Sequence, residues 1–346
     1  MNKVRSDLYK EAGVDIDLAS SLLKKLKPKF KKAMRKEMLT QIGGFGGLFQ
    51  INIKKYKNPV LVSSIDGVGT KILVALMMNK YSNIGMDIVN HCINDIAVQG
   101  AEPIYFMDYI GIGKLKDHLY EDVLSGIIEA CKNANCALLG GETAEMPGVY
   151  QDEFDLVGVI TGIVEKDKII TGERIKVGYA AIGISSNGLH TNGYSLARKI
   201  LFEQLRYTPF DEFKELGESI GDALLKPHLS YLPAIKAAIK HKLNLDGIAH
   251  ITGGGLYDNV PRILPEKVGV QFQTGILPIP PIFKMIIEGG NISKEEAYRV
   301  FNMGIGMVWF LPNNEAEEAI KICKKTGFNA AKIGEVIKGN KNVIID

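Results

Sequence analysis

The stretch Pro59-Val-Leu-Val-Ser-Ser-Ile-Asp-Gly-Val-Gly-Thr-Lys71 indicates the fold class of this chain. Residues Pro59–Ile65 form a short β-branched run that is typical of a buried strand. A glycine-rich turn, Asp66–Lys71, follows directly and leads into an apolar helical stretch, Ile72–Met78. The small residues of the turn let a ligand approach the backbone closely. The stretch therefore predicts an α/β unit with a candidate ligand site where the strand ends.

Two side chains of this turn suit phosphate chemistry. Lys71 supplies a positive charge, and Asp66 is a candidate ligand for a divalent metal. The turn is not a Walker A loop, because the pattern GxxxxGK[ST] is absent. A plain strand-to-helix connection is an equally good interpretation of these six residues taken alone.

The segment Asp87–Gln99 is the most informative helical pattern. At 100° per residue, Asp87, His91, Asn94 and Asp95 fall within an arc of roughly 100°. Apolar residues occupy the rest of the circumference. The pattern predicts a helix that packs through its apolar side and turns its carboxylates toward another group.

Strand and helix patterns alternate along the rest of the chain. Strands are predicted at residues 104–110, 136–139, 156–164, 179–185, 268–273 and 304–311, and helices at 120–133, 194–205 and 315–326. A hydrophilic joint, Glu165–Lys176, separates two halves of similar length. We therefore expect an α/β (or α+β) protein of two domains, residues 1–168 and 169–346.

Composition excludes several classes of protein. With 346 residues, 46% hydrophobic and 23% charged, the chain is too apolar to be disordered. A net charge of +3 gives no electrostatic sign of nucleic-acid binding. No apolar stretch reaches membrane-spanning length, and Met1–Arg5 does not lead into a secretory apolar core. Four cysteines without CxxC pairs are expected to be buried thiols, so a cytoplasmic protein without membrane or nucleic-acid partners is expected.

Three further glycine-rich segments are predicted to be turns that carry catalytic or ligand-binding groups. Gly140–Gly148 carries Glu142 and Glu145 after a strand, although a solvated loop remains an alternative. Ser185–Gly193 precedes a helix and contains His190, a titratable donor near a helix N-terminus suited to phosphate. The third segment, His250–Gly255, has three consecutive glycines that would suit close approach of an anion, whereas its histidine is the weaker candidate.

The residue types indicate the metal and the kind of reaction. Asp66, Asp87, Asp95 and Glu142 offer hard oxygen ligands, which suit Mg²⁺ rather than zinc, with the amide of Asn94 beside them. Carboxylates, a metal and several anion-binding turns together indicate chemistry on a nucleoside triphosphate. The remaining histidines, His118, His228 and His241, have no sequence neighbours that suggest chemistry.

Taken in order, these motifs resemble those of the aminoimidazole ribonucleotide synthetase family. The resemblance rests on Asp66–Lys71, Ile93–Ala97, Val98–Pro103, Gly140–Gly148 and Ser186–Gly193, with Tyr9–Asp17 and His250–Gly255 at its two ends. It runs from about Tyr9 to the C-terminus without large gaps. As a set these motifs are highly specific, although none of them is specific alone.

The resemblance implies a two-domain ATP-binding synthetase fold. Its N-terminal domain would bind ATP and Mg²⁺ and form a homodimer in which strands of both subunits close a shared β-barrel, and a C-terminal α/β domain would complete the active site. The reaction implied is a step of purine biosynthesis, in which formylglycinamidine ribonucleotide and ATP give aminoimidazole ribonucleotide, ADP and phosphate. ATP would phosphorylate the formamide oxygen, and ring closure would then expel phosphate from this iminophosphate.

The resemblance also implies roles for individual residues. Asp66, Asp95 and Glu142 would bind Mg²⁺, and the catalytic groups would be His190, Lys71 and Asp95. Other positions would contact the nucleotide or the ribose phosphate, with the glycine-rich loop near Phe45 folding over the nucleotide as a cover. These positions are Gly44, Phe45, Gly46, Gly67, Gly69, Thr70, Asn94, Gly141, Asn192, Gly193, Gly253 and Gly254.

Related activities are less compatible with the sequence. A selenophosphate synthetase would be expected to have a cysteine or selenocysteine near the N-terminus, but no cysteine precedes Cys92 in this sequence. The hydrogenase-maturation relative would end in a reactive cysteine, whereas this sequence ends Val-Ile-Ile-Asp346. Thiamine-monophosphate kinase would lack the motif Gly140–Gly148, and the amidotransferase of the preceding purine step is several times longer. A non-catalytic nucleotide-binding subunit would not need so many metal-type ligands.

Overall fold

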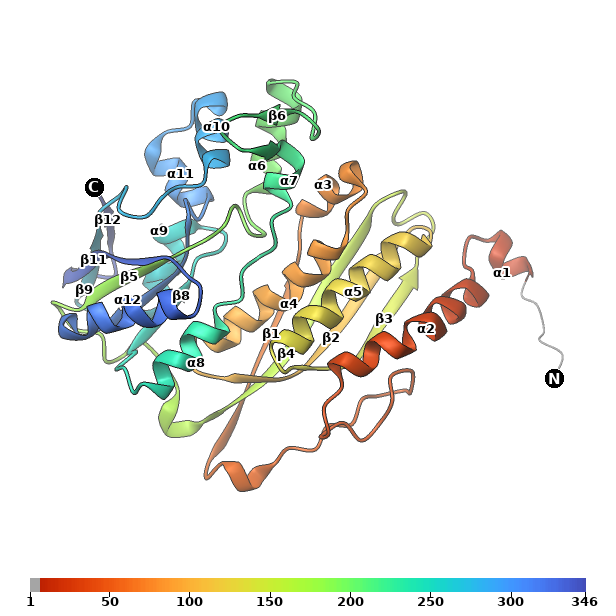
Figure 1. Cartoon of the computed structure of the whole chain (residues 1–346), viewed down its shortest axis with the longest axis horizontal. Coiled ribbons are helices and arrows are strands. Elements are labelled where there is room, and N and C mark those ends of the chain that lie inside the picture. The colour runs from red at the N-terminus through yellow and green to blue at the C-terminus, as the bar shows by residue number, and fades with distance from the viewer. Residues whose placement is uncertain (1–6) are drawn as a thin grey trace.

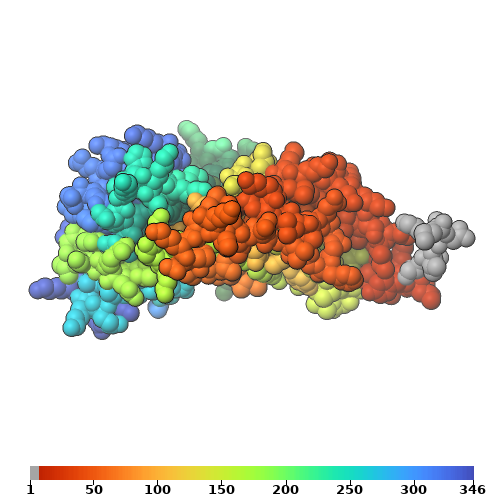
Figure 2. Space-filling view, turned by 90° about the horizontal axis from the view of Figure 1, so that it is seen from below, coloured from red at the N-terminus to blue at the C-terminus, as the bar shows by residue number. Residues whose placement is uncertain are grey.

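The computed structural model describes residues 7–346, which fold around two separate β-sheets (Figure 1). The N-terminal half holds a four-stranded sheet in the order β1-β4-β2-β3. The C-terminal half holds a six-stranded sheet in the order β12-β9-β11-β5-β10-β8, with a small ribbon of β6 and β7 beside it. The molecule is elongated, with one half at each end (Figures 1 and 2). Two sheets with their own helices confirm the predicted two-domain α/β fold. The opening residues Met1–Arg5 lie outside the described part.

The elements of the N-terminal half follow one another in this order: α1 (Asp7–Glu11), α2 (Ile16–Phe30), β1 (Pro59–Gly67), α3 (Lys71–Met78), α4 (Ser82–Ala97), β2 (Glu102–Ile112), α5 (Asp117–Asn133), β3 (Ala137–Glu145) and β4 (Phe154–Glu165). The long segment between α2 and β1 contains only short 3₁₀ turns. In Figure 2 the segment before β1, red to orange, covers much of the visible side of this half.

The elements of the C-terminal half are β5 (Ala180–Ser185), α6 (Tyr194–Arg198), β6 (Glu212–Phe213), β7 (Glu218–Ser219), α7 (Ile220–Leu224), α8 (Leu232–Lys240), β8 (Gly247–His250), α9 (Gly255–Asn259), β9 (Val268–Phe272), α10 (Pro281–Gly290), α11 (Lys294–Val300), β10 (Ile305–Leu311), α12 (Ala316–Lys325), β11 (Ala330–Lys338) and β12 (Val343–Ile345). Every residue of β10 is buried, as befits a strand inside a sheet. The sheet is mixed, because β12 alone runs parallel to its neighbour β9.

Helices α4 and α5 cover one face of the N-terminal sheet (Figure 1). They pack closely at two glycines: a Cβ on Gly85 would lie 2.0 Å from the carbonyl oxygen of Val123, and one on Gly126 would lie 1.9 Å from that of Ser82. Any larger side chain would push the helices apart. This contact fixes α4 against β1 and β4, and α4 carries the polar stripe that the sequence predicted.

The opposite face of the same sheet is open in the single chain. Along β1, exposed and less exposed residues alternate, and Leu61 and Ile65 are 54% and 68% exposed. Their antiparallel partners on β4 are Ile163 and Val159, so apolar side chains from neighbouring strands share this face. An apolar sheet face of this kind is usually covered by another element or another chain.

One predicted turn is partly a strand. The sequence predicted that β3 would end at Leu139 and that Gly140–Gly148 would form a loop, but β3 continues to Glu145. The extension pairs in parallel with β2, with Glu142 opposite Tyr109. Ladder hydrogen bonds with β2 outweigh the poor strand propensity of the two glycines. Helix α4 also begins earlier than predicted, at Ser82 rather than Asp87.

Two further predictions, on the state of the cysteines and on membrane-spanning segments, can be compared with the structure. All four cysteines are free and buried, as predicted. Among the described residues, no helix combines the length and apolar character that crossing a bilayer requires.

Candidate active site

Two carboxylates converge where β1 meets α4, and we call Ser64, Asp66 and Asp95 the acidic corner. The hydroxyl of Ser64 lies 3.0 Å from Asp66 Oδ2 and 3.2 Å from Asp95 Oδ2. Both carboxylates are partly open to solvent, with side chains 28% and 30% exposed. The predicted pair of acidic residues, one from a strand end and one from a helix, is therefore brought together.

An imidazole supports each carboxylate. His91 Nε2 lies 3.4 Å from Asp66 Oδ1, and His250 Nδ1 lies 2.8 Å from Asp95 Oδ1. Burial by itself would raise the pKa of Asp95, but the hydrogen bond and charge of His250 hold it well below its ordinary value. Burial would likewise lower the pKa of His91, but the hydrogen bond to Asp66 and the nearby carboxylates raise it. The carboxylate of Asp95 is thus kept ionised.

The two imidazoles belong to a polar network that joins the domains. His91 Nδ1 lies 2.8 Å from the hydroxyl of Thr191, which lies 3.3 Å from His228 Nδ1. His228 Nε2 in turn lies 3.0 Å from His250 Nε2. The chain of contacts therefore runs from one carboxylate of the acidic corner through the C-terminal domain and back to the other.

His190 does not face the acidic corner as a proton donor. Its ring is fully buried and stacks on His228, with the ring centroids 4.1 Å apart, and neither ring nitrogen has a hydrogen-bond partner. Burial, with the charge of His250, holds the pKa of His190 well below its ordinary value. The predicted role as a titratable donor is not supported by this geometry, because the ring is neutral and enclosed.

The polar stripe of α4 meets the backbone of the C-terminal domain. We call the contacts between α4 and the segment Leu225–Tyr231 the interdomain clasp. Side-chain amides along one side of the helix donate to main-chain carbonyls: Asn83 to Leu225 (2.9 Å), Asn90 to His228 (2.7 Å) and Asn94 to Leu229 (2.8 Å). The Asn94 amide oxygen also accepts from Tyr231 N at 2.9 Å. Asn94, predicted to bind nucleotide, is thus buried and fully engaged in holding the domains together.

The buried ion pair of Lys71, at the start of α3, and Asp87 of α4 contacts the same segment, and we include it in the interdomain clasp. Lys71 Nζ lies 2.7 Å from Asp87 Oδ2 and donates to the carbonyl of Lys226 at 2.6 Å, and both side chains of the ion pair are fully buried. Asp87 Oδ1 accepts from His228 N at 2.6 Å. Burial lowers the pKa of Lys71 and raises that of Asp87, while their mutual attraction opposes both shifts. Lys71, predicted to neutralise phosphate, is enclosed by protein instead.

Three glycine-rich turns meet beside the acidic corner. The turn after β1 contacts α6 through the hydroxyls of Thr70 and Ser195, 3.0 Å apart. A Cβ on Gly253 would lie 3.2 Å from Asn192 Oδ1, so the turn that contains Asn192 and the turn that contains Gly253 are adjacent. The left-handed glycines among the predicted contacts in these turns are Gly69 (φ +69°), Gly193 (φ +81°) and Gly254 (φ +93°). With Gly67 at the end of β1, these contacts bring glycine-rich backbone of both domains together.

Other predicted residues lie away from the corner of their own chain. Gly141 is in register with Asp108 of β2, which is in register with Gly158 of β4, the partner of Asp66. Glu142, one residue further along, is therefore separated from Asp66 by three strand spacings, roughly 14 Å. Among the described residues the acidic corner gains no third carboxylate from β3.

The predicted cover loop also contacts other strands. A Cβ on Gly47 would lie 2.3 Å from Leu139 of β3, and the rings of Phe49 and Tyr105 of β2 contact each other at a tilt of 51°, with their centroids 5.7 Å apart. The tip of the loop, Gly44, Phe45 and Gly46, is exposed. Glu145, expected to face a cation, instead accepts hydrogen bonds from Asp15 N at 2.7 Å and Leu115 N at 2.8 Å.

Sequence reasoning missed several members of the site. His250 was judged the weaker histidine, and His228 was set aside, although both lie at the centre of the network. His91 was placed correctly on the polar arc of its helix but was given no role. The position of His91 four residues before Asp95 was a usable signal, whereas nothing near His228 in the sequence marks it.

The donor set of the acidic corner fits Mg²⁺ in part. Two carboxylates around one hydroxyl provide the hard oxygen ligands that this ion takes, and the imidazoles behind them orient the carboxylates. His91, Asp95 and His250 also place possible ligand atoms within 4.8 Å of one another. Each of these imidazoles already has a hydrogen-bond partner, so we interpret them as supports of the carboxylates.

Family models match both halves of the chain. Residues 50–164 match the N-terminal domain of AIR synthase related proteins, and residues 176–346 match the C-terminal domain. The chain is also similar over nearly its whole length to two curated proteins named phosphoribosylformylglycinamidine cyclo-ligase. The protein from Alkaliphilus oremlandii is 47% identical over 97% of this chain and 99% of its own, and that from Geobacter sulfurreducens is 48% identical over 96% of both.

Solved structures of more distant proteins share the fold. Thiamine-monophosphate kinase from Stenotrophomonas maltophilia superposes with a TM-score of 0.68 at 15% identity, covering 94% of this chain and 96% of the other. Hydrogenase maturation protein HypE in complex with ATP superposes with a TM-score of 0.67 at 16% identity, covering 92% and 86%. At these identities the likeness concerns the fold alone.

Proposed function

Because the chain belongs to the phosphoribosylformylglycinamidine cyclo-ligase family, whose reaction is a step of purine biosynthesis, we propose that the acidic corner is where it uses ATP to close the imidazole ring of aminoimidazole ribonucleotide. The observation that carries this proposal is the meeting of Asp66 and Asp95 with glycine-rich turns of both domains. Phosphoryl transfer needs this combination, because positioning and charge neutralisation supply most of its rate enhancement.

The chemistry of the substrate explains the use of ATP. The formamide oxygen of formylglycinamidine ribonucleotide is a poor leaving group. Transfer of the γ-phosphoryl group to that oxygen gives an iminophosphate and ADP. The amidine nitrogen then attacks the activated carbon, the carbon–oxygen bond breaks, and inorganic phosphate leaves as the ring closes and a proton is lost. The enzyme has to hold the two reacting centres together and keep water away from the intermediate.

Different residues would bind the metal, bind the phosphates and hold these groups in position. Asp66 and Asp95 would hold Mg²⁺, which when bound neutralises triphosphate charge. The turns that carry Gly67, Gly69 and Thr70 on one side, and Asn192, Gly193, Gly253 and Gly254 on the other, would supply backbone N–H groups for the phosphates. His91 and His250 fix the carboxylates in place. Lys71 and Asn94 contribute as positioning residues through the interdomain clasp, and His190 packs beneath the network.

The substrate is tested by measuring ADP release. We expect release with formylglycinamidine ribonucleotide and none above background with thiamine monophosphate or selenide. A chain that releases ADP only with thiamine monophosphate would show the fold without the proposed activity.

We also propose that the chain forms a homodimer through the open face of the N-terminal sheet. The exposed side chains of Leu61 and Ile65 support this, because two such faces packed together would close a barrel and bury them. In the dimer, Glu142 and the exposed loop at Phe45 would approach the acidic corner of the second copy. This arrangement would complete the predicted set of three acidic ligands, which one chain does not assemble.

Mixing two inactive variants tests the shared site. Asp66→Asn and Glu142→Gln should each be inactive, whereas a mixed dimer has one site with both native residues. Random reassortment makes half of the dimers mixed, so about a quarter of wild-type activity should return. The matched control mixes Asp66→Asn with Asp95→Asn, which damages the corner of both chains and should restore nothing. Equal failure of the two mixtures would contradict a shared site.

The domain boundary and the location remain proposals of the same kind. A division between residues 168 and 169 is supported by the end of β4 at Glu165 and the start of β5 at Ala180. Cytoplasmic location remains a prediction from the sequence.

A further inference from the structure

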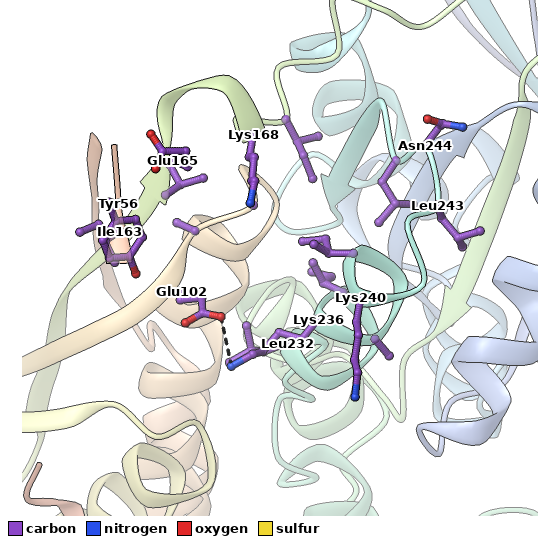
Figure 3. A pocket seen from close by; sticks show the side chains of 18 of the residues that line it. Tyr56, Glu102, Ile163, Glu165, Lys168, Leu232, Lys236, Lys240, Leu243 and Asn244 are labelled. Atoms are coloured by element: carbon purple, nitrogen blue, oxygen red, sulfur yellow. Dashed lines mark ion pairs between the residues drawn. The ribbon is translucent and has the colours of Figure 1, made fainter. Parts of the chain in front are cut away.

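A cavity lies between the two domains, and none of its lining residues belongs to the acidic corner (Figure 3). Its volume is about 760 Å³, within the range of small-molecule sites. The N-terminal domain contributes Ala101 and the start of β2 at Glu102, together with Ile163 near the end of β4, and the C-terminal domain contributes α8 and the loop after it. We call this space the lysine pocket after the basic residues at its rim.

The floor of the lysine pocket is apolar. Leu232 and Ile235 of α8 line it opposite Ile163 and Ile170, and all four side chains are buried. Tyr56 adds a half-buried aromatic ring. A floor of this composition accepts a planar or aliphatic body and gives no hydrogen bonds to a strongly polar one.

The rim of the lysine pocket carries an excess of positive charge. Its five cationic residues are Lys55, Lys168, Arg174, Lys236 and Lys240, against two acidic residues, Glu102 and Glu165. Arg174 is already neutralised, because its Nε lies 2.7 Å from Asp246 Oδ1 outside the pocket lining, so the excess comes from the lysines.

Both carboxylates of the rim are already engaged. Glu102 lies 3.6 Å from Lys236 Nζ, and Glu165 accepts from the backbone nitrogens of Lys57 and Asn58. Among residues 7–346 no carboxylate lies within ion-pair distance of Lys168, whose side chain reaches into the cavity in Figure 3. The pocket therefore has unneutralised positive charge above an apolar floor.

We propose that the lysine pocket binds a small phosphomonoester with a planar or apolar body, of the size of a nucleoside monophosphate. Lys168 and Lys236, from different domains, would neutralise the phosphate. Residues of the apolar floor and Tyr56 would cover the body. A phosphate dianion suits two flexible lysines better than a carboxylate does, because it offers more acceptor oxygens and charge.

The lysine pocket is mechanically linked to the interdomain clasp. Leu232 lines the pocket and directly follows Tyr231, whose backbone N–H is held by Asn94 of α4. On the other side, Ala101 lies four residues after the end of α4. A ligand that bridges Lys168 and Lys236 therefore joins the same two domains as the clasp, and its binding should raise the melting temperature of the chain.

Binding of AMP, measured by titration calorimetry, tests the proposal. The variant Lys168→Ala/Lys236→Ala should bind AMP at least about tenfold more weakly than the native chain, a change of about 1.4 kcal/mol. The matched control Lys325→Ala/Lys338→Ala removes two exposed lysines elsewhere and should bind normally. Ala237→Trp, which fills the cavity without changing its charge, should also weaken AMP binding. Equal affinity in the native chain and both pocket variants would overturn the proposal.

Two further titrations distinguish AMP binding in the lysine pocket from AMP binding in the acidic corner, and test the ligand class. Asp66→Asn should leave AMP affinity unchanged, and a loss there that equals the loss in the lysine variant would place AMP in the acidic corner instead. Adenosine and inorganic phosphate should each bind more weakly than AMP, because each lacks one half of the ligand. If phosphate alone binds as tightly as AMP, the apolar floor has no role and the proposed ligand class is wrong.

Discussion

The interdomain clasp and the acidic corner use the same residue types on the same helix, yet they do opposite work. In the clasp, Asp87 is completely enclosed, with Lys71 and a backbone N–H as partners. In the corner, Asp95 lies two turns further along α4 and keeps nearly a third of its side chain open to solvent. The first carboxylate is satisfied by protein, and the second has capacity left for a cation.

The difference teaches that burial and partners, rather than residue type, separate structural from chemical carboxylates. A buried ion pair gains little net stability, because desolvation offsets its attraction, but losing one partner is costly. A half-exposed carboxylate beside a histidine keeps its charge at little cost. The comparison predicts that corner variants lose activity while clasp variants lose stability.

The largest effect is expected from Asp66→Asn. Removing one charge from the corner should lower kcat by roughly 1000-fold, comparable to losing a main electrostatic contact in other enzymes. The melting temperature should change by little, because Asp66 is partly exposed. Steady-state kinetics and thermal melting measure the two effects. Asp152→Asn, at an exposed turn position, is the control and should keep full activity.

The next largest effect is expected from Asp87→Ala. This change leaves the Lys71 ammonium buried without its partner, so the free energy of unfolding should fall by about 3 to 5 kcal/mol. Replacing both residues, in Lys71→Met/Asp87→Leu, should recover much of that loss, because no charge remains buried. Urea unfolding gives both values. If Asp87→Ala is as stable as the native chain, Asp87 does not have the structural role that separates the clasp from the acidic corner.

A buried carboxylate without a cationic partner sharpens the comparison further. Asp108 lies on β2 opposite Gly141 of β3, and burial raises its pKa from 3.8 to about 7. Because the folded state binds the proton more tightly, stability is lost as pH rises from about 4 to about 7, the opposite of the usual behaviour of a paired carboxylate. At pH 8, Asp108→Asn should therefore be more stable than the native chain, by about 2 to 4 kcal/mol.

The measurement for Asp108 is urea unfolding at pH 4 and pH 8. At pH 4 the two chains should differ by much less, since the side chain of Asp108 is protonated in the fold and close to half protonated in the unfolded chain. An Asn variant that is less stable at pH 8 than at pH 4, relative to the native chain, would show that the fold does not raise the pKa of Asp108.

The local sequence pattern predicts much of the fold and part of the site. The strand–turn–helix unit around Asp66 and the polar stripe of α4 follow from residues close in sequence, and the structure confirms both. The periodicity of the stripe does not say what it faces. Its partner is a segment more than a hundred positions away, with His228 and Asp87 separated by 141 residues. Burial of Lys71 and Asn94 follows from that distant contact.

Other errors also have long-range causes. The glycines of Gly140–Gly141 are typical of a turn, but pairing with β2 keeps them in a strand. His190 was predicted to be a titratable donor near a helix N-terminus, but its ring is buried beside Gly306 of β10, where a Cβ would lie only 2.8 Å from His190 Cε1. In each case a partner from elsewhere in the chain decided the environment.

The central claim is that Asp66 and Asp95 form the place where magnesium and the triphosphate of ATP meet. A crystal structure with Mg²⁺ and a non-hydrolysable ATP analogue tests it most directly. We expect the ion at about 2.1 Å from an oxygen of Asp66 or Asp95, with the triphosphate against the turns at Gly69, Gly193 and Gly254. An ion bound elsewhere, with the two carboxylates still held only by Ser64, His91 and His250, would contradict the claim.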